Sequence, residues 1–275
     1  MIKTGLVVEG GGMRGSHSCG VLMAMVKKGL IHFDVVAGVS AGACTSAFLV
    51  SGQFDILPLI WTKHLYGDKF IKYRNLARRK SVMDLDYLID EVFGKRQPLD
   101  VKAIQKSNTR FYITATNCET GQATYFDNHH PELLKALKSS SAIPIAYRQP
   151  VVIGGKHYMD GGLSDPIPIQ KVIHEGCQKI YVVLTRPAGY RKKDPLLNVL
   201  PRFYQKSYPR LAETIANRHA LYNKTLERLE TGDYPADIVL IRPKEKMAIN
   251  RFSTNLKKIH ASIEQGYQDA MGVLS

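Results

Sequence analysis

Residues 33–50 read FDVVAGVSAGACTSAFLV. An apolar strand, FDVVAGV, is followed directly by a small-residue helix, AGACTSAFLV, so Ser40 falls in the tight turn between them. Because Gly38 and Gly42 lack Cβ atoms, the turn can be sharp, and we expect Ser40 at its tip, at the positive end of the helix dipole. The pattern favours a nucleophile elbow. The alternative is a packing turn whose serine only caps the helix.

Apolar strands and helices alternate along most of the chain. Strands that are apolar almost throughout indicate a parallel sheet covered on both faces, so we predict an α/β fold, a three-layer α/β/α sandwich with a mostly parallel central sheet. The uncharged stretch 35–54 is as long as a membrane span, but its glycines, serines and threonines fit strand, turn and buried helix better. The expected strands are 5–9, 33–39, 111–116, 123–126, 156–159, 179–184 and, at an edge, 237–241; the expected helices are 16–28, 41–50, 84–93, 131–138, 167–174, a long helix to about 229, and 253–271.

A glycine turn follows the first expected strand. It reads Glu9-Gly10-Gly11-Gly12-Met13-Arg14-Gly15 and matches G-x-G-x-x-G. A dinucleotide-binding turn needs an acidic residue at the end of the second strand, and Asp34 lies at the wrong end of that strand. The Gly-Lys-Ser/Thr of a P-loop is also missing. One strand–helix–strand unit separates this turn from Ser40, so we expect both turns at the same edge of the sheet, with bare N–H groups facing the hydroxyl.

A third turn, Asp160-Gly161-Gly162, follows a short strand. Taken alone, Asp before two glycines is most often a structural turn. A reactive serine needs a base, and none of the nine histidines lies in a recognisable partner motif. The late histidines, His219 and His260, fall within expected long helices. The residues by themselves leave the identity of the base open.

Together, the three turns resemble the motifs of the patatin-like phospholipase family, in the same order and over about residues 1–185. The segment Ser139-Ser140-Ser141-Ala142-Ile143-Pro144 is similar to the small-residue stretch that precedes the family's Asp motif. Glu9 stands where the family often has Asp, which we interpret as a tolerated structural change. The resemblance implies Ser40 as nucleophile, Asp160 as its catalytic partner, Gly10, Gly11 and Gly12 as the oxyanion hole with Arg14 supporting that loop, and Gly15, Gly38, Gly42, Gly161 and Gly162 as structural residues of the motifs.

The resemblance also implies a function: a serine lipid acyl hydrolase that cleaves a phospholipid, a lysophospholipid or a simple carboxylic ester through an acyl-enzyme. A carboxylate with an ordinary pKa of about 4 is a weak base towards serine, so we expect Asp160 to be buried or half-buried beside Ser40. No cofactor and no metal are expected, because no metal-ligand motif occurs. Two alternatives remain: a catalytically silent membrane- or ligand-binding protein on the same scaffold and, less favoured, a dinucleotide-binding protein.

The 275 residues carry a formal net charge of +14, and most of the basic excess lies in segments 61–82, 186–210 and 242–258. These segments form either ordinary solvated surface or a peripheral docking surface for anionic membrane, whereas no aromatic–basic motif supports nucleic-acid binding. Four widely spaced cysteines and an N-terminus without a secretory signal favour a reducing compartment, so we expect a cytoplasmic enzyme that contacts the membrane peripherally at most.

We expect a single domain over residues 1–275. Its catalytic core would end at about residue 185, and residues 186–275 would form a helical and edge-strand extension in which no catalytic motif is visible. A similar basic helical tail occurs in some bacterial members of the patatin-like family, which points to a bacterial member.

Overall fold

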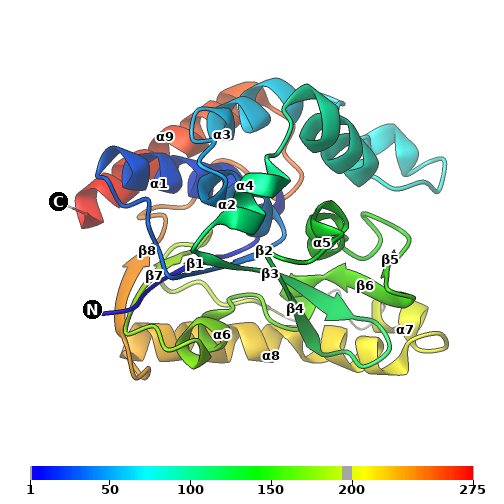
Figure 1. Cartoon of the computed structure of the whole chain (residues 1–275). Coiled ribbons are helices and arrows are strands. Elements are labelled where there is room, and N and C mark those ends of the chain that lie inside the picture. Colours follow the sequence, from blue (N-terminus) through cyan, green and yellow to red (C-terminus); the bar gives the residue numbers. More distant parts are fainter. Residues whose placement is uncertain (1, 194–199, 275) are drawn as a thin grey trace.

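One eight-stranded sheet forms the centre of the computed structural model, which describes residues 2–193 and 200–274 (Figure 1). The strand order is β5-β6-β3-β2-β1-β7-β8, and β4 pairs with β3. The five strands from β3 to β8 in this order are parallel neighbours, whereas β4, β5 and β6 pair antiparallel, so the sheet is mostly parallel, as predicted. The strands are β1 (Thr4–Val8), β2 (Val35–Val39), β3 (Arg110–Asn117), β4 (Ala123–Asp127), β5 (Val151–Ile153), β6 (Lys156–Asp160), β7 (Lys179–Val183) and β8 (Asp237–Ile241).

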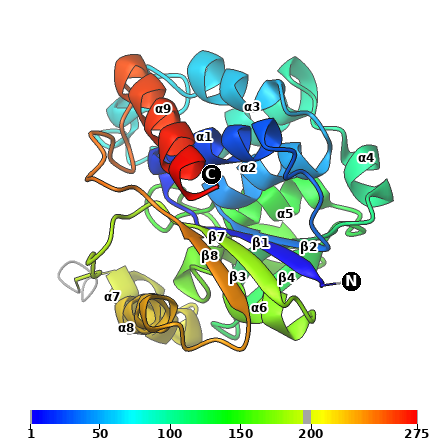
Figure 2. The same cartoon turned by 90° about the vertical axis from the view of Figure 1, so that its left-hand side faces the viewer.

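Helices cover both faces of this sheet. Helices α1, α2 and α9 lie on one face, and α6 and α8 lie on the other (Figures 1 and 2). This arrangement confirms the predicted three-layer sandwich. The helices are α1 (Gly15–Lys27), α2 (Ala41–Val50), α3 (Ile56–Leu59), α4 (Val101–Lys106), α5 (Leu133–Ser140), α6 (Ile169–His174), α7 (Leu200–Tyr204), α8 (Pro209–Thr231) and α9 (Leu256–Val273).

Some elements differ from the prediction. The helix expected at 84–93 is present, but Tyr87–Arg96 is wound as a π-helix and the segment extends to Arg96. The polar stretch from 186 to 209, expected to be irregular, contains the short helix α7, and residues 194–199 of that stretch lie outside the described part. The short elements α3, α4 and β5 were not predicted, because segments of three to six residues are too short to show a helical or strand period.

The apolar strands supply two cores, one on each face of the sheet. Along β1, Leu6 and Val8 pack in the core under α1 and α2, while Val7 packs in the core on the α8 side. This alternation is the two-residue period of a strand, and every one of these side chains is fully buried. The strands are therefore apolar almost throughout because both faces are covered.

The C-terminal part of the chain is packed into this framework. Strand β8 extends the sheet beside β7, at the edge where it was predicted. Helix α9 lies directly against α1, as Figure 2 shows, and the buried His17 and Asp269 join the two helices through a 3.1 Å contact. Residues that precede α9 reach back to the glycine turn, where Met13 N donates to the carbonyl oxygen of Arg251 over 3.0 Å.

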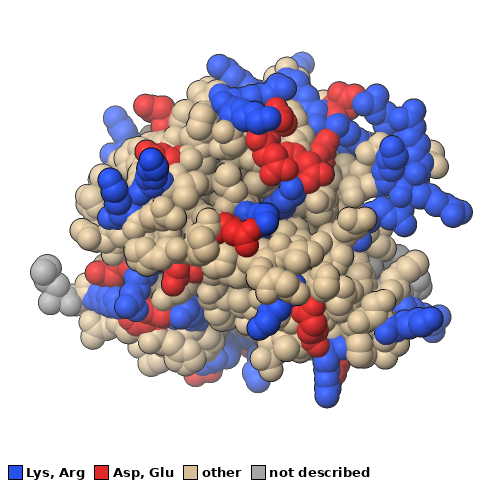
Figure 3. Space-filling model, turned by 45° about the vertical axis from the view of Figure 1, so that its right-hand side comes forward, with Lys and Arg blue, Asp and Glu red and all other residues tan. Residues whose placement is uncertain are grey.

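The surface is rich in basic side chains. In the face drawn in Figure 3, Lys and Arg side chains gather on the upper right-hand side, and acidic side chains are fewer. Among the residues that the structure describes, no helix combines the length and the apolar composition needed to cross a membrane. The uncharged stretch 35–54 forms β2, the turn at Ser40 and α2, as predicted.

Candidate active site

Ser40 sits at the tip of a sharp strand–turn–helix bend. Strand β2 ends at Val39, helix α2 begins at Ala41, and Ser40 between them has φ +55° and ψ −127°. A non-glycine residue in this conformation is strained by about 1–3 kcal/mol. The bend fits because Gly42 passes so close to β1 that a Cβ there would lie 2.3 Å from the carbonyl oxygen of Val8. Ser40 is 4% exposed, so the predicted elbow is present at the carboxyl end of its strand.

The bend is held in place by the small-residue segment 139–144. Ser40 N donates to Ser140 Oγ over 2.8 Å, and Ser140 Oγ in turn donates to the carbonyl oxygen of Thr114 over 2.6 Å. Asp160 N donates to the carbonyl oxygen of Ala142 over 3.0 Å. The segment therefore contacts both turns, and only small side chains leave room for them.

Asp160 ends β6 and is brought to Ser40 by the sheet. Its Oδ1 accepts from Gly162 N over 2.8 Å, which closes the turn that contains Gly161, and the carboxyl group is near enough to Ser40 for the Ser40 side chain to lower its pKa. Asp160 is 5% exposed, as expected for a partner of Ser40. The Asp-Gly-Gly motif is thus both a structural turn and a means of placing a carboxylate beside the serine.

The environment of Asp160 makes it a stronger base than an ordinary aspartate. Burial raises the pKa of its carboxyl above the usual 3.8, and the charge of Arg218, the hydrogen bond from Ser40 and the N–H of Gly162 offset part of that rise. Burial disfavours the carboxylate, so the group binds a proton more readily than it would in water.

The glycine turn lies against Ser40 from the neighbouring strand. A Cβ on Gly10 would lie 2.9 Å from Ser40 Cβ, and Gly12 has φ +56°, a conformation that favours glycine. Within residues 2–193 and 200–274, no acceptor takes a hydrogen bond from the backbone N–H of Gly10, Gly11 or Gly12. Strands β1 and β2 are parallel neighbours, so the two turns emerge at the same edge, as predicted. Gly15, the last glycine of the motif, begins α1.

One acidic residue, Glu9, and one basic residue, Arg14, lie beside the glycines of this turn. Glu9 is buried, with Oε2 accepting from Thr185 N over 2.6 Å and Oε1 accepting from Tyr222 Oη over 2.8 Å. The longer side chain of Glu thereby reaches α8, which agrees with a structural role at this position. Arg14 is 6% exposed, and burial, with repulsion from Arg186 and Arg251, lowers its pKa to about 10.

A cavity of about 360 Å³ opens over these groups, and Ser40, Asp160 and the three glycines of the turn line it. Its described lining residues include no histidine, and the carboxyl groups among them are those of Glu9 and Asp160. A second, apolar cavity lies on the α2 side and shares Ser40 and Gly12 with the first; Phe48 and Trp61 are among the side chains that close it.

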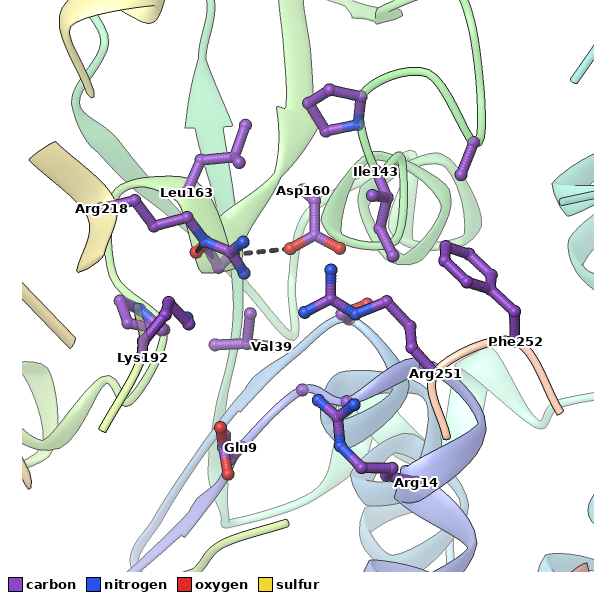
Figure 4. Close-up of a pocket in the computed structure, with 18 of the residues that line it drawn as sticks. Glu9, Arg14, Val39, Ile143, Asp160, Leu163, Lys192, Arg218, Arg251 and Phe252 are labelled. Atoms are coloured by element: carbon purple, nitrogen blue, oxygen red, sulfur yellow. Dashed lines mark hydrogen bonds between the residues drawn. The ribbon is translucent and has the colours of Figure 1, made fainter. Parts of the chain in front are cut away.

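The cavity also contains residues that the sequence did not indicate. Arg186, Lys192, Arg218 and Arg251 line it and all come from the region after residue 185, where no chemistry was visible in the sequence (Figure 4). Arg218 on α8 donates to the carbonyl oxygen of Gly162. The available signal was the basic excess in segments 186–210 and 242–258, which contain three of these residues, but charge alone does not say where a side chain lies.

Comparison with known proteins identifies the scaffold. The family model described as patatin-like phospholipase matches residues 6–173, which is more than half of the chain. The chain belongs to the patatin-like phospholipase family. A second family model, described as a domain of unknown function, matches residues 208–275 of this patatin-like protein.

Two curated relatives of this patatin-like chain are informative. An uncharacterised protein of Escherichia coli, YjjU, is 30% identical over 189 residues, which cover 68% of this chain and 53% of YjjU. The lysophospholipase NTE1 of Saccharomyces cerevisiae is 22% identical over 275 residues, which cover 95% of this chain and 16% of the yeast protein. The chain thus spans about half of the first relative and a small part of the second.

A solved structure supports the same patatin-like architecture. The crystal structure of VipD from Legionella pneumophila superposes with a TM-score of 0.51 at 15% sequence identity, covering 99% of this chain and 66% of VipD. At this level of identity the likeness concerns the fold alone.

Proposed function

We propose that this patatin-like protein is a serine lipid acyl hydrolase, a phospholipase, lysophospholipase or carboxylester hydrolase. The observation that carries the proposal is the buried pair formed by Ser40 and Asp160, whose side chains interact and which line the same cavity. Membership of the family, and the lysophospholipase among its relatives, support an ester of a lipid as the substrate.

In the proposed reaction, Ser40 Oγ attacks the acyl carbonyl carbon while its proton passes to the carboxylate of Asp160. The negative charge that develops on the carbonyl oxygen is stabilised by the free N–H groups of Gly10, Gly11 and Gly12, and one such donor is typically worth about 3 kcal/mol. Asp160 then returns the proton to the leaving alcohol, and the acyl group stays on Ser40. A water molecule, deprotonated by Asp160, cleaves this ester and regenerates the serine.

The apolar cavity on the α2 side, of about 40 Å³, has room for the first carbons of the acyl chain. It begins at Ser40, and its wall carries aromatic and aliphatic side chains such as Phe48, Trp61 and Leu88. A hydrocarbon chain leaving the ester carbonyl in this direction would be removed from water, at about 0.8 kcal/mol per methylene. The larger cavity, which several charged side chains line, is left for the rest of the lipid.

The test is covalent labelling with alkyl fluorophosphonates of increasing chain length. We expect one label per chain, on the peptide that contains Ser40, and a labelling rate that rises with chain length while the apolar cavity fills. Ser40→Ala should not be labelled. A label on Cys44, or labelling that proceeds unchanged in Ser40→Ala, would contradict the proposal, and an unlabelled but folded wild-type protein would favour the silent binding protein instead.

We also propose that the rim of the main cavity contacts an anionic membrane. Tyr73, Leu76 and Ile145 line the cavity, and they are 52%, 59% and 52% exposed. Exposed basic residues follow in the same segment, namely Arg74, Arg78, Arg79 and Lys80. Apolar side chains that enter the lipid interface beside several cations are typical of a peripheral membrane surface.

Leu76→Asp is expected to weaken binding to phosphatidylglycerol vesicles at least tenfold, because it removes a leucine whose burial in the membrane is worth about 1.5–3 kcal/mol and adds a charge that the lipid repels. Vesicle flotation measures the bound fraction. Ile2→Asp is the matched control, since Ile2 is 68% exposed but precedes β1, at the opposite end of the sheet from the cavity. Equal loss in both variants, or wild-type binding by Leu76→Asp, would count against this surface.

A further inference from the structure

Five cationic side chains surround the main cavity: Arg14, Arg186, Lys192, Arg218 and Arg251. They come from four separate parts of the chain, and Figure 4 shows Arg14, Arg218 and Arg251 directed towards the space around Asp160. The carboxylates in the cavity lining are those of Glu9 and Asp160. The described lining therefore carries more positive than negative charge, and this excess faces the reactive serine.

These cations are not held in close ion pairs by the residues that the structure describes. Within the described residues, none of the five forms an ion pair with a carboxylate. Glu9, the nearest candidate besides Asp160, is already held by Thr185 and Tyr222. By contrast Arg191, one residue before Lys192, is paired with Glu230 over 2.6 Å. In the described part of the chain, the surface arginine thus has a carboxylate in direct contact, and the five cavity cations have none.

The cavity cations are partly removed from water: Arg14 is buried and the other four are half-buried. Arg14 is 6% exposed, and its Nε has no hydrogen-bond partner. Burial lowers the pKa of Lys192 well below its ordinary value, and repulsion by Arg218 and Arg251 lowers it further. Charges that are partly removed from water and repel one another are costly when they are left unpaired, so an arrangement that keeps five of them around one cavity indicates an anionic ligand.

The positions of the cations relative to the dyad indicate which part of a substrate they would meet. In Figure 4, Arg218 and Lys192 lie on one side of Asp160, and Ile143 and Phe252 lie on the other. The guanidinium of Arg251 lies between Asp160 and Arg14. Ser40 and the five cations line the same cavity, so a substrate whose ester carbonyl lies at Ser40 meets these cations with its remaining part.

We propose that this cluster of five cations recognises a phosphate group in the acyl substrate, so that the enzyme prefers phospholipids or lysophospholipids whose head group carries a net negative charge. The inference rests on the proposed function. Arg14 and Arg218 also serve the glycine turn and Asp160, whereas Arg186 and Lys192 have no part in the proposed acyl transfer. These two are the specificity residues, and guanidinium and ammonium groups suit phosphate oxygens.

The test compares lysophosphatidylglycerol with lysophosphatidylcholine of the same acyl chain, both as monomers so that membrane docking does not contribute. They share the phosphodiester and differ in the cationic choline. We expect kcat/KM for the anionic lipid to exceed that for the zwitterionic lipid at least about tenfold, the worth of one charge-assisted hydrogen bond. In Arg186→Gln/Lys192→Gln the ratio should fall to near one, and in the matched control Arg191→Gln it should stay as in the wild type.

Two further arms separate the explanations. Turnover of an uncharged p-nitrophenyl ester reports on the acyl hydrolase itself, so its absence from the folded wild type would contradict the proposed function. Its presence with equal turnover of the two lysolipids would overturn only the head-group proposal. Inorganic phosphate and glycerol 3-phosphate are compared as inhibitors of that ester reaction. Stronger inhibition by glycerol 3-phosphate than by inorganic phosphate supports a head-group site. Equal inhibition by the two, together with equal kcat/KM for the two lysolipids, would show that the cation cluster binds free phosphate and would overturn the proposal.

Discussion

Asp160→Asn is expected to lower kcat/KM for ester hydrolysis by about 10³-fold, within the range of a lost general base. The substitution keeps the shape of the side chain and an oxygen that can accept from Gly162 N, so the turn should survive. It removes the group that takes the proton from Ser40. Initial rates on an uncharged ester measure the loss, and an unchanged circular dichroism spectrum and Tm show that the fold remains.

The same carboxyl sets the pH dependence. Asp160 must be ionised to act as base, and burial raises its pKa above 3.8, so kcat/KM should fall as the pH drops through a value higher than that of an ordinary aspartate. The acid limb of the profile reports this pKa. Protonation of the base is the cause of the loss, so activity returns when the pH is raised again.

Another carboxyl group with a raised pKa, that of Asp165, provides the control for the rate and for the pH profile. Burial raises the pKa of Asp165 to about 6, and Asp165 Oδ2 accepts from Tyr125 Oη over 2.6 Å, but Asp165 is outside the described cavity lining. Asp165→Asn should leave the acid limb in place. An acid limb that moves in Asp165→Asn, or a rate in Asp160→Asn within a factor of ten of the wild type, would remove Asp160 from the proposed role.

The parts of the site that could be predicted are those encoded by local chain geometry. A strand that runs into G-x-S-x-G and a helix can bend in few ways, so Ser40 was placed from its neighbours alone. The glycine turn could be placed at the same edge of the sheet, because two parallel strands joined by one helix have their carboxyl ends at the same edge. Asp160 is different: its turn chemistry favoured a structural role, and only the resemblance to a family joined it to Ser40.

The cations of the cavity could not be predicted, for a physical reason. Arg218 lies in the middle of α8 and Arg251 in an irregular segment before α9, and neither has a motif around it. Their position depends on how β8 and α9 return to the sheet, which is a property of long-range packing. A basic run in the sequence is compatible with solvated surface or with a site, and only the fold distinguishes them.

Gly266→Ala is expected to destabilise the protein strongly, because α9 and α1 approach each other at this point. A Cβ on Gly266 would lie 2.0 Å from the carbonyl oxygen of His17, and one on Gly20 would lie 1.9 Å from the carbonyl oxygen of Ile263. The clashing atoms belong to the backbones of α1 and α9, which cannot shift locally within a helix. The two helices must therefore move apart. Overpacking of this kind costs about 3 kcal/mol, against a gain of up to about 1 kcal/mol in helix propensity, which predicts a Tm lower by about 5 °C.

Gly272→Ala is the matched control on the same helix, since a Cβ there would meet only the flexible end of Lys244, at 3.0 Å from Nζ. Its Tm should stay within about 2 °C of the wild type, because the Lys244 side chain can move aside.

We propose that residues 1–275 form one domain, so Gly266→Ala should shift a single unfolding transition rather than release a separate C-terminal one. Because Arg251 O accepts from Met13 N next to the glycine turn, parting α9 from α1 should also lower the rate of ester hydrolysis. An unchanged Tm in Gly266→Ala, or a C-terminal transition that melts alone while the ester is still cleaved at the wild-type rate, would show that the extension is independent of the site.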